Sequence, residues 1–356
     1  NTGTKIDSIV IARTSVAEYA FTFEDEQTTV ELSKADLTDK KELPGASLKV
    51  TDEDGNTVDE WVSKEEAHII KGLIVGKKYK MTETKPADGY VTAESIEFTV
   101  ENTKEVQKHQ MLDDVTKVEI SKKDITDSSE VPGAKLIILD KDGKKVESWT
   151  STDKPHMVEK LPVGEYTLRE EQAPDGYLIA EDVKFTVKDT GKVQKVKMKD
   201  AHPYGKLVIK KTDSTSKAAL SGAEFELREK ESGKVVEKLV TDKTGTATSG
   251  KIPIATYKNG KVEKTVEYIL VETKAPNGYE LSSKKEEIRF EYKDGKTKVI
   301  EIVKEIKNTK SPSGSTPTGN SPKTGDSTNI WLPILLAVLS ACGIGGVIWY
   351  KKKKGN

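Results

Sequence analysis

Residue types that are rarely buried recur at fixed places in strand-like segments of this 356-residue chain. Three segments that alternate apolar and polar residues end in a lysine, and these lysines are Lys34, Lys122 and Lys211. Later segments place a glutamate after a tyrosine and an apolar residue, at Glu83, Glu170 and Glu272. A last set of segments ends in Asp113, Asp200 and Asn308. Because side chains two residues apart share one face of a strand, the apolar neighbours predict that all nine side chains point into a core.

These three residue types together suggest a covalent chemistry. Burying a charge without a partner costs several kcal/mol, so three such residues in one core need a reason. A buried lysine loses its proton readily and becomes a nucleophile. It can attack the side-chain carbonyl of Asp or Asn, while a buried glutamate polarises that carbonyl and shuttles protons. The product is a neutral intramolecular isopeptide bond. The alternative is that these residues form salt bridges whose charged ends reach the surface of ordinary β-sandwich domains.

The spacing of these residues indicates internal repeats. The lysines lie 88 and 89 residues apart. A Gly-Ala pair follows each lysine, with the glycine 11 residues after it, at Gly45-Ala46, Gly133-Ala134 and Gly222-Ala223. A Gly-Tyr pair follows each glutamate, with the tyrosine 7 residues after it, at Gly89-Tyr90, Gly176-Tyr177 and Gly278-Tyr279. Motifs that keep their order and spacing three times predict three copies of one domain.

The elements that carry these motifs are predicted to be strands. Segments of period two are separated by hairpin signals at Asp54-Gly55, Asp142-Gly143 and Ser232-Gly233. We therefore expect an all-β chain of tandem antiparallel β-sandwich domains of the Ig-like or prealbumin-like kind, each of about 90–100 residues. The third repeat has 61 residues between its lysine and glutamate, against 48 in the second. An extra hairpin near Tyr257 to Lys264 accounts for the difference.

The repeats set the expected domain boundaries. Complete domains are expected at 28–116, 117–203 and 204–309. Residues 1–27 look like the end of one more repeat, because Asp25 precedes Lys34 by the same 9 residues that separate Asp113 from Lys122. The chain is therefore interpreted as the C-terminal part of a longer protein.

The lysine strand, Gly-Ala pair, Tyr-x-Leu-x-Glu box and Gly-Tyr turn together resemble the Cna B-type, SpaA-like prealbumin-fold domains of Gram-positive pilins and adhesins. The resemblance covers about residues 28–309, although Pro86-Ala87 reverses the usual Ala-Pro and Met81 replaces a leucine. It implies that Lys34 is joined to Asp113 with Glu83 assisting. It implies the same for Lys122 with Asp200 and Glu170, and for Lys211 with Asn308 and Glu272.

The C-terminal region resembles a sortase sorting signal of the LPxTG type. The motif Ser321-Pro322-Lys323-Thr324-Gly325, in which Ser321 replaces the leucine, lies in a linker at 310–329. An uncharged stretch at 330–350 is long enough to span a membrane, and the basic tail at 351–356 is expected in the cytoplasm. The resemblance implies that a sortase cleaves after Thr324 and joins it to a peptidoglycan precursor or to a pilin lysine. The membrane is then a partner only before sorting. A single-pass membrane protein is the alternative.

Composition excludes several classes of function. Lys and Arg number 58 against 59 Asp and Glu, so no electrostatic case exists for nucleic acid. The one cysteine, Cys342, permits no intrachain disulfide. No cofactor or metal is expected, because the acidic turns lack the spaced glutamate of an EF-hand and the four histidines are scattered, at His68, His109, His156 and His202. Apart from the residues that would form the intramolecular isopeptide bonds, the sequence indicates no active site, and the chain is not expected to be an enzyme.

The resulting hypothesis is a secreted protein anchored to the cell wall of a Gram-positive surface. Its cross-linked repeats form a rigid stalk that presents an upstream adhesive region. Three alternatives remain: a basal or minor pilus subunit, repeats that themselves bind a host extracellular-matrix protein, and a surface enzyme whose catalytic domain lies upstream. The segment His202-Pro203-Tyr204-Gly205-Lys206 does not match the Tyr-Pro-Lys motif of a backbone pilin.

Overall fold

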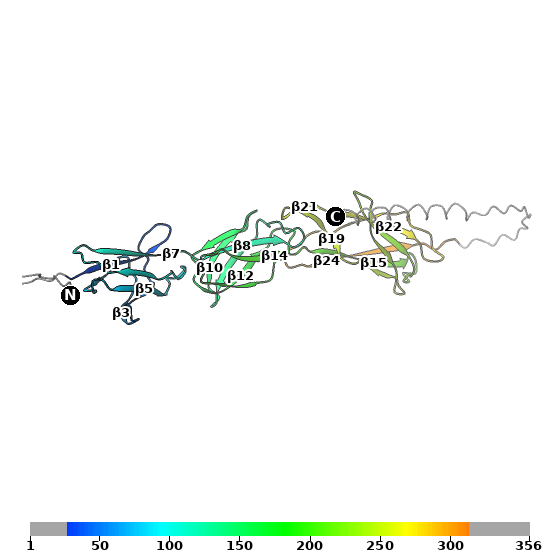
Figure 1. Ribbon diagram of the computed structural model, residues 1–356. Coiled ribbons are helices and arrows are strands. Elements are labelled where there is room, and N and C mark those ends of the chain that lie inside the picture. The colour runs from blue at the N-terminus through cyan, green and yellow to red at the C-terminus, as the bar shows by residue number, and fades with distance from the viewer. Residues whose placement is uncertain (1–26, 313–356) are drawn as a thin grey trace, which may run out of the picture. The chain divides into compact units, whose positions relative to one another are not determined.

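The computed structural model of the chain describes residues 27–312, and strands are the only regular elements within that range (Figure 1). The sorting motif, the uncharged stretch and the basic tail lie outside it, as does nearly all of the predicted upstream repeat. Between residues 27 and 312, no helix is long and apolar enough to cross a membrane.

The first repeat is a sandwich of two sheets, ordered β4-β1-β7 and β3-β2-β5-β6. Alternating burial along β1 and β2 places one face of each strand in the core between the sheets. The strands of this repeat are β1 (Thr29–Asp36), β2 (Ser47–Thr51), β3 (Thr57–Val62), β4 (His68–Lys71), β5 (Lys78–Lys85), β6 (Ile96–Thr99) and β7 (Gln107–Asp113).

The second repeat has the same order of strands, in sheets β11-β8-β14 and β10-β9-β12-β13. Its strands are β8 (Lys117–Asp124), β9 (Lys135–Asp140), β10 (Lys145–Thr150), β11 (His156–Glu159), β12 (Gly164–Gln172), β13 (Val183–Val187) and β14 (Gln194–Asp200).

The third repeat keeps this plan and adds a two-stranded hairpin, β20-β21. The hairpin includes the segment from Tyr257 to Lys264 that its greater length predicts, and it turns at Asn259-Gly260, where both residues have positive φ. The strands are β15 (Tyr204–Asp213), β16 (Glu224–Glu229), β17 (Val235–Val240), β18 (Thr246–Thr248), β19 (Ile252–Pro253), β20 (Ala255–Lys258), β21 (Lys261–Thr265), β22 (Glu267–Lys274), β23 (Glu286–Arg289) and β24 (Val299–Asn308).

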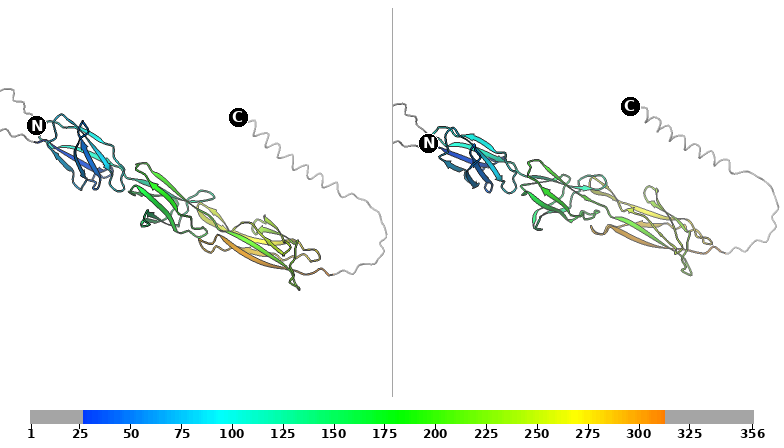
Figure 2. Two further views of the ribbon diagram at one scale, coloured as in Figure 1. Left: turned by 90° about the horizontal axis from the view of Figure 1, so that it is seen from below. Right: turned by 60° about the horizontal axis from the view of Figure 1, so that its bottom comes forward.

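Each repeat has its own hydrophobic core. Separate clusters of buried side chains are centred on Leu32 and Met81, on Ile120 and Leu168, and on Phe225. Figure 2 shows the strands of the three repeats as three separate groups. The predicted all-β class and the three tandem domains are therefore confirmed.

One strand pairing in each repeat departs from a purely antiparallel sandwich. The first and last strands run parallel, as β1-β7, β8-β14 and β15-β24. In the first repeat the register sets Lys34 beside Met111 and Asp36 beside Asp113. Period-two patterning predicts which face a residue occupies but not the strand with which it pairs, so this pairing is not visible in the sequence. It brings the lysine strand and the acceptor strand side by side.

Three buried triads of lysine, glutamate and acceptor

The structure brings the predicted residues of the first repeat together in its core. Lys34 lies on β1, Glu83 on β5 of the facing sheet, and Asp113 at the end of β7. The Lys34 Nζ is 2.8 Å from Glu83 Oε1 and contacts Asp113 Oδ1. All three residues are at most 4% exposed. The parallel pairing of β1 with β7 thus brings Asp113 to the Lys34 nitrogen, and the packing of the sheet that contains β5 brings Glu83 to the same atom.

The second repeat reproduces this geometry on β8, β12 and β14. The Lys122 Nζ is 2.9 Å from Glu170 Oε2 and contacts Asp200 Oδ1. The separation between lysine and acceptor is 78 residues, against 79 in the first repeat. The two aspartate triads are therefore equivalent sites built by equivalent strands.

The third repeat has an asparagine as the acceptor. The Lys211 Nζ is 3.4 Å from Glu272 Oε1 and contacts Asn308 Oδ1. The other end of the amide faces the glutamate, since Asn308 Nδ2 donates to Glu272 Oε1 at 2.9 Å and to Oε2 at 3.1 Å. The amide nitrogen therefore lies next to a group that can hand it a proton.

Burial of all nine side chains is confirmed, and the alternative of salt bridges whose charged ends reach the surface is wrong because none of these residues is more than 5% exposed. Removal from water has a clear electrostatic effect on the acceptors. It raises the pKa of Asp113 to about 7, although Lys34 opposes the shift, and it raises the pKa of Asp200 to about 7 in the same way. Burial also lowers the pKa of Lys211, against the opposing effect of Glu272.

The second oxygen of each acceptor aspartate faces no hydrogen-bond partner. Asp113 Oδ2 and Asp200 Oδ2 are buried and unpaired among the residues of the described range. An unpaired carboxylate oxygen in a core is costly, whereas a protonated one is neutral. The raised pKa values and the lone oxygens together indicate acceptors that hold a proton near neutral pH.

A backbone contact that the sequence did not suggest fixes each glutamate. The carboxylate Oε2 accepts a hydrogen bond from the backbone N–H ten residues later, donated by Ala93, Ala180 and Ser282 at 2.6, 2.6 and 2.8 Å. In Glu170 this same oxygen also faces Lys122 Nζ. The offset of ten residues between glutamate and donor is the same in all three repeats. The sequence does not reveal this contact, because the donor is a backbone N–H in the loop after the Gly-Tyr turn and the side chains at that position differ.

Other candidates in the chain lack comparable chemistry. His68 and His156 stack on Trp61 and Trp149, with ring centroids 4.1 and 4.4 Å apart. Their Nε2 atoms lie 2.8 Å from Asp59 and 3.7 Å from Glu147, so both imidazoles have structural partners. Over residues 27–312, no group of three His, Cys, Asp or Glu side chains could hold a metal ion.

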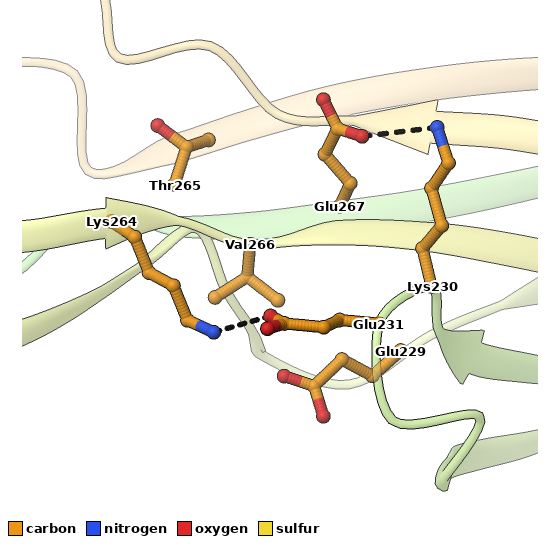
Figure 3. A pocket seen from close by; sticks show the side chains of 7 residues that line it. All are labelled: Glu229, Lys230, Glu231, Lys264, Thr265, Val266 and Glu267. Atoms are coloured by element: carbon orange, nitrogen blue, oxygen red, sulfur yellow. Dashed lines mark hydrogen bonds and ion pairs between the residues drawn. The ribbon is translucent and has the colours of Figure 1, made fainter.

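A surface hollow of about 180 Å³ in the third repeat is lined mainly by charged side chains (Figure 3). Within it Lys264 pairs with Glu231, and Lys230 lies 3.1 Å from Glu267. These charges satisfy one another at the surface. The hollow does not involve the buried triads.

Comparison with known proteins identifies the repeats. A family model described as SpaA, a prealbumin-like fold domain, matches residues 28–114, 116–202 and 205–306. No curated protein matches the sequence. Among solved structures, the Bacillus anthracis TIE protein is 27% identical with a TM-score of 0.54, over 80% of this chain and 52% of that one. The chain thus spans about half the length of that protein.

Two pilins are also similar. BcpA, the major pilin subunit of Bacillus cereus, is 18% identical with a TM-score of 0.47, over 80% of this chain and 100% of that one. The full-length major pilin SpaD from Corynebacterium diphtheriae is 18% identical with a TM-score of 0.37, over 82% of this chain and 99% of that one.

Proposed function

This chain belongs to the SpaA family of prealbumin-like fold domains, and from that premise we propose that each repeat makes an intramolecular isopeptide bond that braces a surface stalk. The observation that carries the proposal is the position of each lysine Nζ, which contacts an acceptor oxygen and has a glutamate carboxylate within 3.4 Å. The bonds proposed are Lys34–Asp113, Lys122–Asp200 and Lys211–Asn308.

In the third repeat the reaction releases ammonia. The neutral Lys211 Nζ attacks Asn308 Cγ, so a C–N bond forms and the Cγ–Nδ2 bond breaks. Glu272 accepts the proton that the lysine nitrogen loses and donates it to Nδ2, which departs as ammonia. The hydrogen bonds from Nδ2 to both Glu272 oxygens support this assignment of the proton donor and the leaving group.

In the first and second repeats the same steps release water. The attack is on the aspartate Cγ, so a C–N bond forms and one Cγ–O bond breaks. The departing oxygen carries the proton of the acid and the proton that the lysine nitrogen loses to the glutamate, and it leaves as water. A carboxylate anion resists such an attack, so the reaction needs the protonated acid. Burial supports this state, since it raises the pKa of Asp113 and of Asp200 to about 7.

The proposal is tested by mass spectrometry of the folded chain. The intact mass is expected to fall short of the sequence mass by two waters and one ammonia. Tryptic digestion should give three cross-linked peptide pairs. Glu83→Ala should abolish the Lys34–Asp113 pair alone, with the other two repeats as internal controls. A chain that keeps its full sequence mass after folding would rule out the bonds.

For the whole protein we propose sortase-mediated anchoring of the stalk to the Gram-positive cell wall. The support is the sorting-type motif, with Thr324 joined to a peptidoglycan amine and the membrane segment removed. Cell-wall fractions are then expected to contain a chain that ends at Thr324. Recovery of the C-terminus through Asn356 in membranes, with none in the wall, would favour the single-pass alternative.

A pilus subunit is the second candidate, and membership of the SpaA family favours it. In that case Thr324 is joined to a lysine of another subunit. Wall extracts boiled in detergent would then give a ladder of polymers that contain this chain. A single wall-linked species would favour the adhesin stalk.

A further inference from the structure

The Gly-Tyr turn of each repeat contacts the end of the lysine strand. The tyrosine hydroxyl donates a hydrogen bond to an aspartate two residues after the triad lysine. The pairs are Tyr90 with Asp36, Tyr177 with Asp124, and Tyr279 with Asp213, at 2.7, 2.7 and 2.9 Å. These aspartates are at most 8% exposed. The contact therefore ties two distant loops together in all three repeats, at an aspartate that is buried in each.

The first of these loops holds the acceptor residue. The residue after the aspartate donates its backbone N–H to the acceptor carbonyl, so Leu37, Ser214 and Ile125 bind Asp113, Asn308 and Asp200 at 2.8, 2.9 and 3.0 Å. The aspartate shapes this loop as well, because its other oxygen accepts the N–H two residues later, from Thr38, Thr126 and Thr215.

The second loop holds the residue after the acceptor. The residue that follows the tyrosine donates its backbone N–H to the next carbonyl of the acceptor strand. Val91 binds Asp114 at 2.9 Å, Leu178 binds Ala201 at 2.9 Å, and Glu280 binds Thr309 at 3.0 Å. The end of the acceptor strand is thus gripped by two loops, and the Tyr–Asp hydrogen bond joins them.

From this arrangement we propose that the tyrosine of the Gly-Tyr turn is a positioning residue for isopeptide formation. The inference rests on the proposed function. Each acceptor is the last residue of its strand, where ladder pairing ends and fraying begins. A displacement of about 1 Å from the attack geometry can slow a reaction by about a hundredfold. The Tyr–Asp contact acts through the two loops to keep the acceptor Cγ beside the lysine nitrogen.

The third repeat offers the cleanest test. In the first, Lys160 of the neighbouring repeat also bonds to the Tyr90 hydroxyl at 2.6 Å, and in the second, His202 bonds to Asp124 at 2.9 Å. Within the described part of the chain, the Tyr279 hydroxyl has Asp213 as its hydrogen-bond partner. The variant Tyr279→Phe removes this one contact.

The experiment follows cross-linking after pulsed synthesis of the full chain. Samples are quenched in denaturant and digested, and the Lys211–Asn308 peptide pair is quantified against the other two pairs. Tyr279→Phe should slow its formation by about tenfold or more, and leave the first two repeats unchanged. The matched control is Tyr268→Phe, which removes a hydroxyl that bonds to Pro253 in the same repeat, and it should leave the rate within about twofold.

A pH profile separates positioning from a change in the triad itself. Positioning predicts a lower rate at every pH with the same midpoint as the unaltered chain. Asp213→Asn keeps a side-chain partner for the hydroxyl and should react faster than Asp213→Ala. Equal rates for the unaltered chain and Tyr279→Phe would overturn the inference.

If Tyr279→Phe does not fold, the comparison of Asp213→Asn with Asp213→Ala tests the inference instead. Equal rates for Asn and Ala would then overturn the inference. A complete lack of cross-linked peptides in the unaltered chain would instead refute the proposed function, so the two failures are distinct.

Discussion

At the scale of single residues, the acceptor is the one position at which the residue types of the three triads differ, and this difference has a chemical consequence. An aspartate acceptor reacts as the protonated acid, whereas an asparagine needs no proton before attack. Lys211 also gains reactivity as pH rises, because its neutral form is the nucleophile. The proposed reaction would therefore need a proton on the acceptor in the first two repeats but not in the third.

We expect cross-linking in the first two repeats to slow as pH rises above 7. The pKa of Asp113 and of Asp200 is raised to about 7, so a higher pH leaves the unreactive carboxylate. Cross-linking in the third repeat should hold steady or quicken. Quantifying the three peptide pairs after pulsed synthesis between pH 5.5 and 8.5 checks this. Asp113→Asn supplies the control, because it should give the first repeat the pH response of the third.

At the scale of elements, the parallel pairing of first and last strands means that each proposed bond would close nearly the whole repeat. The loops closed span 79, 78 and 97 residues. Closure of a loop this long removes roughly 4–5 kcal/mol of unfolded-state entropy by analogy with a disulfide. Because the entropy depends on the logarithm of loop length, the longer third repeat gains little more than the other two.

The expected result is a similar loss of stability in all three repeats when the bond is prevented. Glu83→Ala, Glu170→Ala and Glu272→Ala should each lower the unfolding free energy of their own repeat by at least about 4 kcal/mol. Urea unfolding monitored by hydrogen exchange resolves the repeats. Glu42→Ala is a control, because that glutamate bonds to Ser33 and to the Lys34 backbone N–H but stands outside the triad. A loss confined to one of the three repeats would contradict the account.

The same scale explains what could be predicted from the sequence. The strand periodicity predicted that Lys34, Glu83 and Asp113 point into one core, because each shares a strand face with apolar residues two positions away. The excess length of the third repeat predicted its hairpin. The parallel pairing was not predictable, because β1 and β7 are joined by no short turn that would set their register. The contacts of Ala93 and of Tyr90 were also missed, since both depend on loops brought together only by the closed sandwich.

At the scale of the whole molecule, the proposed bonds form a short covalent route for tension. Nine residues separate the acceptor Asp113 from the next lysine, Lys122, and 11 separate Asp200 from Lys211. Force that enters at one acceptor crosses this connector and leaves through the next lysine strand. At about 3.3–3.6 Å per residue, each connector can yield only some tens of ångströms. With the proposed bonds in place, the sandwiches themselves would carry no load that could unfold them.

Pulling single molecules of the repeat array measures whether the proposed bonds carry the tension. The unaltered chain is expected to lengthen without domain-sized steps. The triple variant Glu83→Ala, Glu170→Ala, Glu272→Ala should show three steps, and release of a 79-residue loop corresponds to roughly 270 Å of chain at about 3.4 Å per residue. Three full-length steps in the unaltered array would show that the lysines are not cross-linked and would contradict the account.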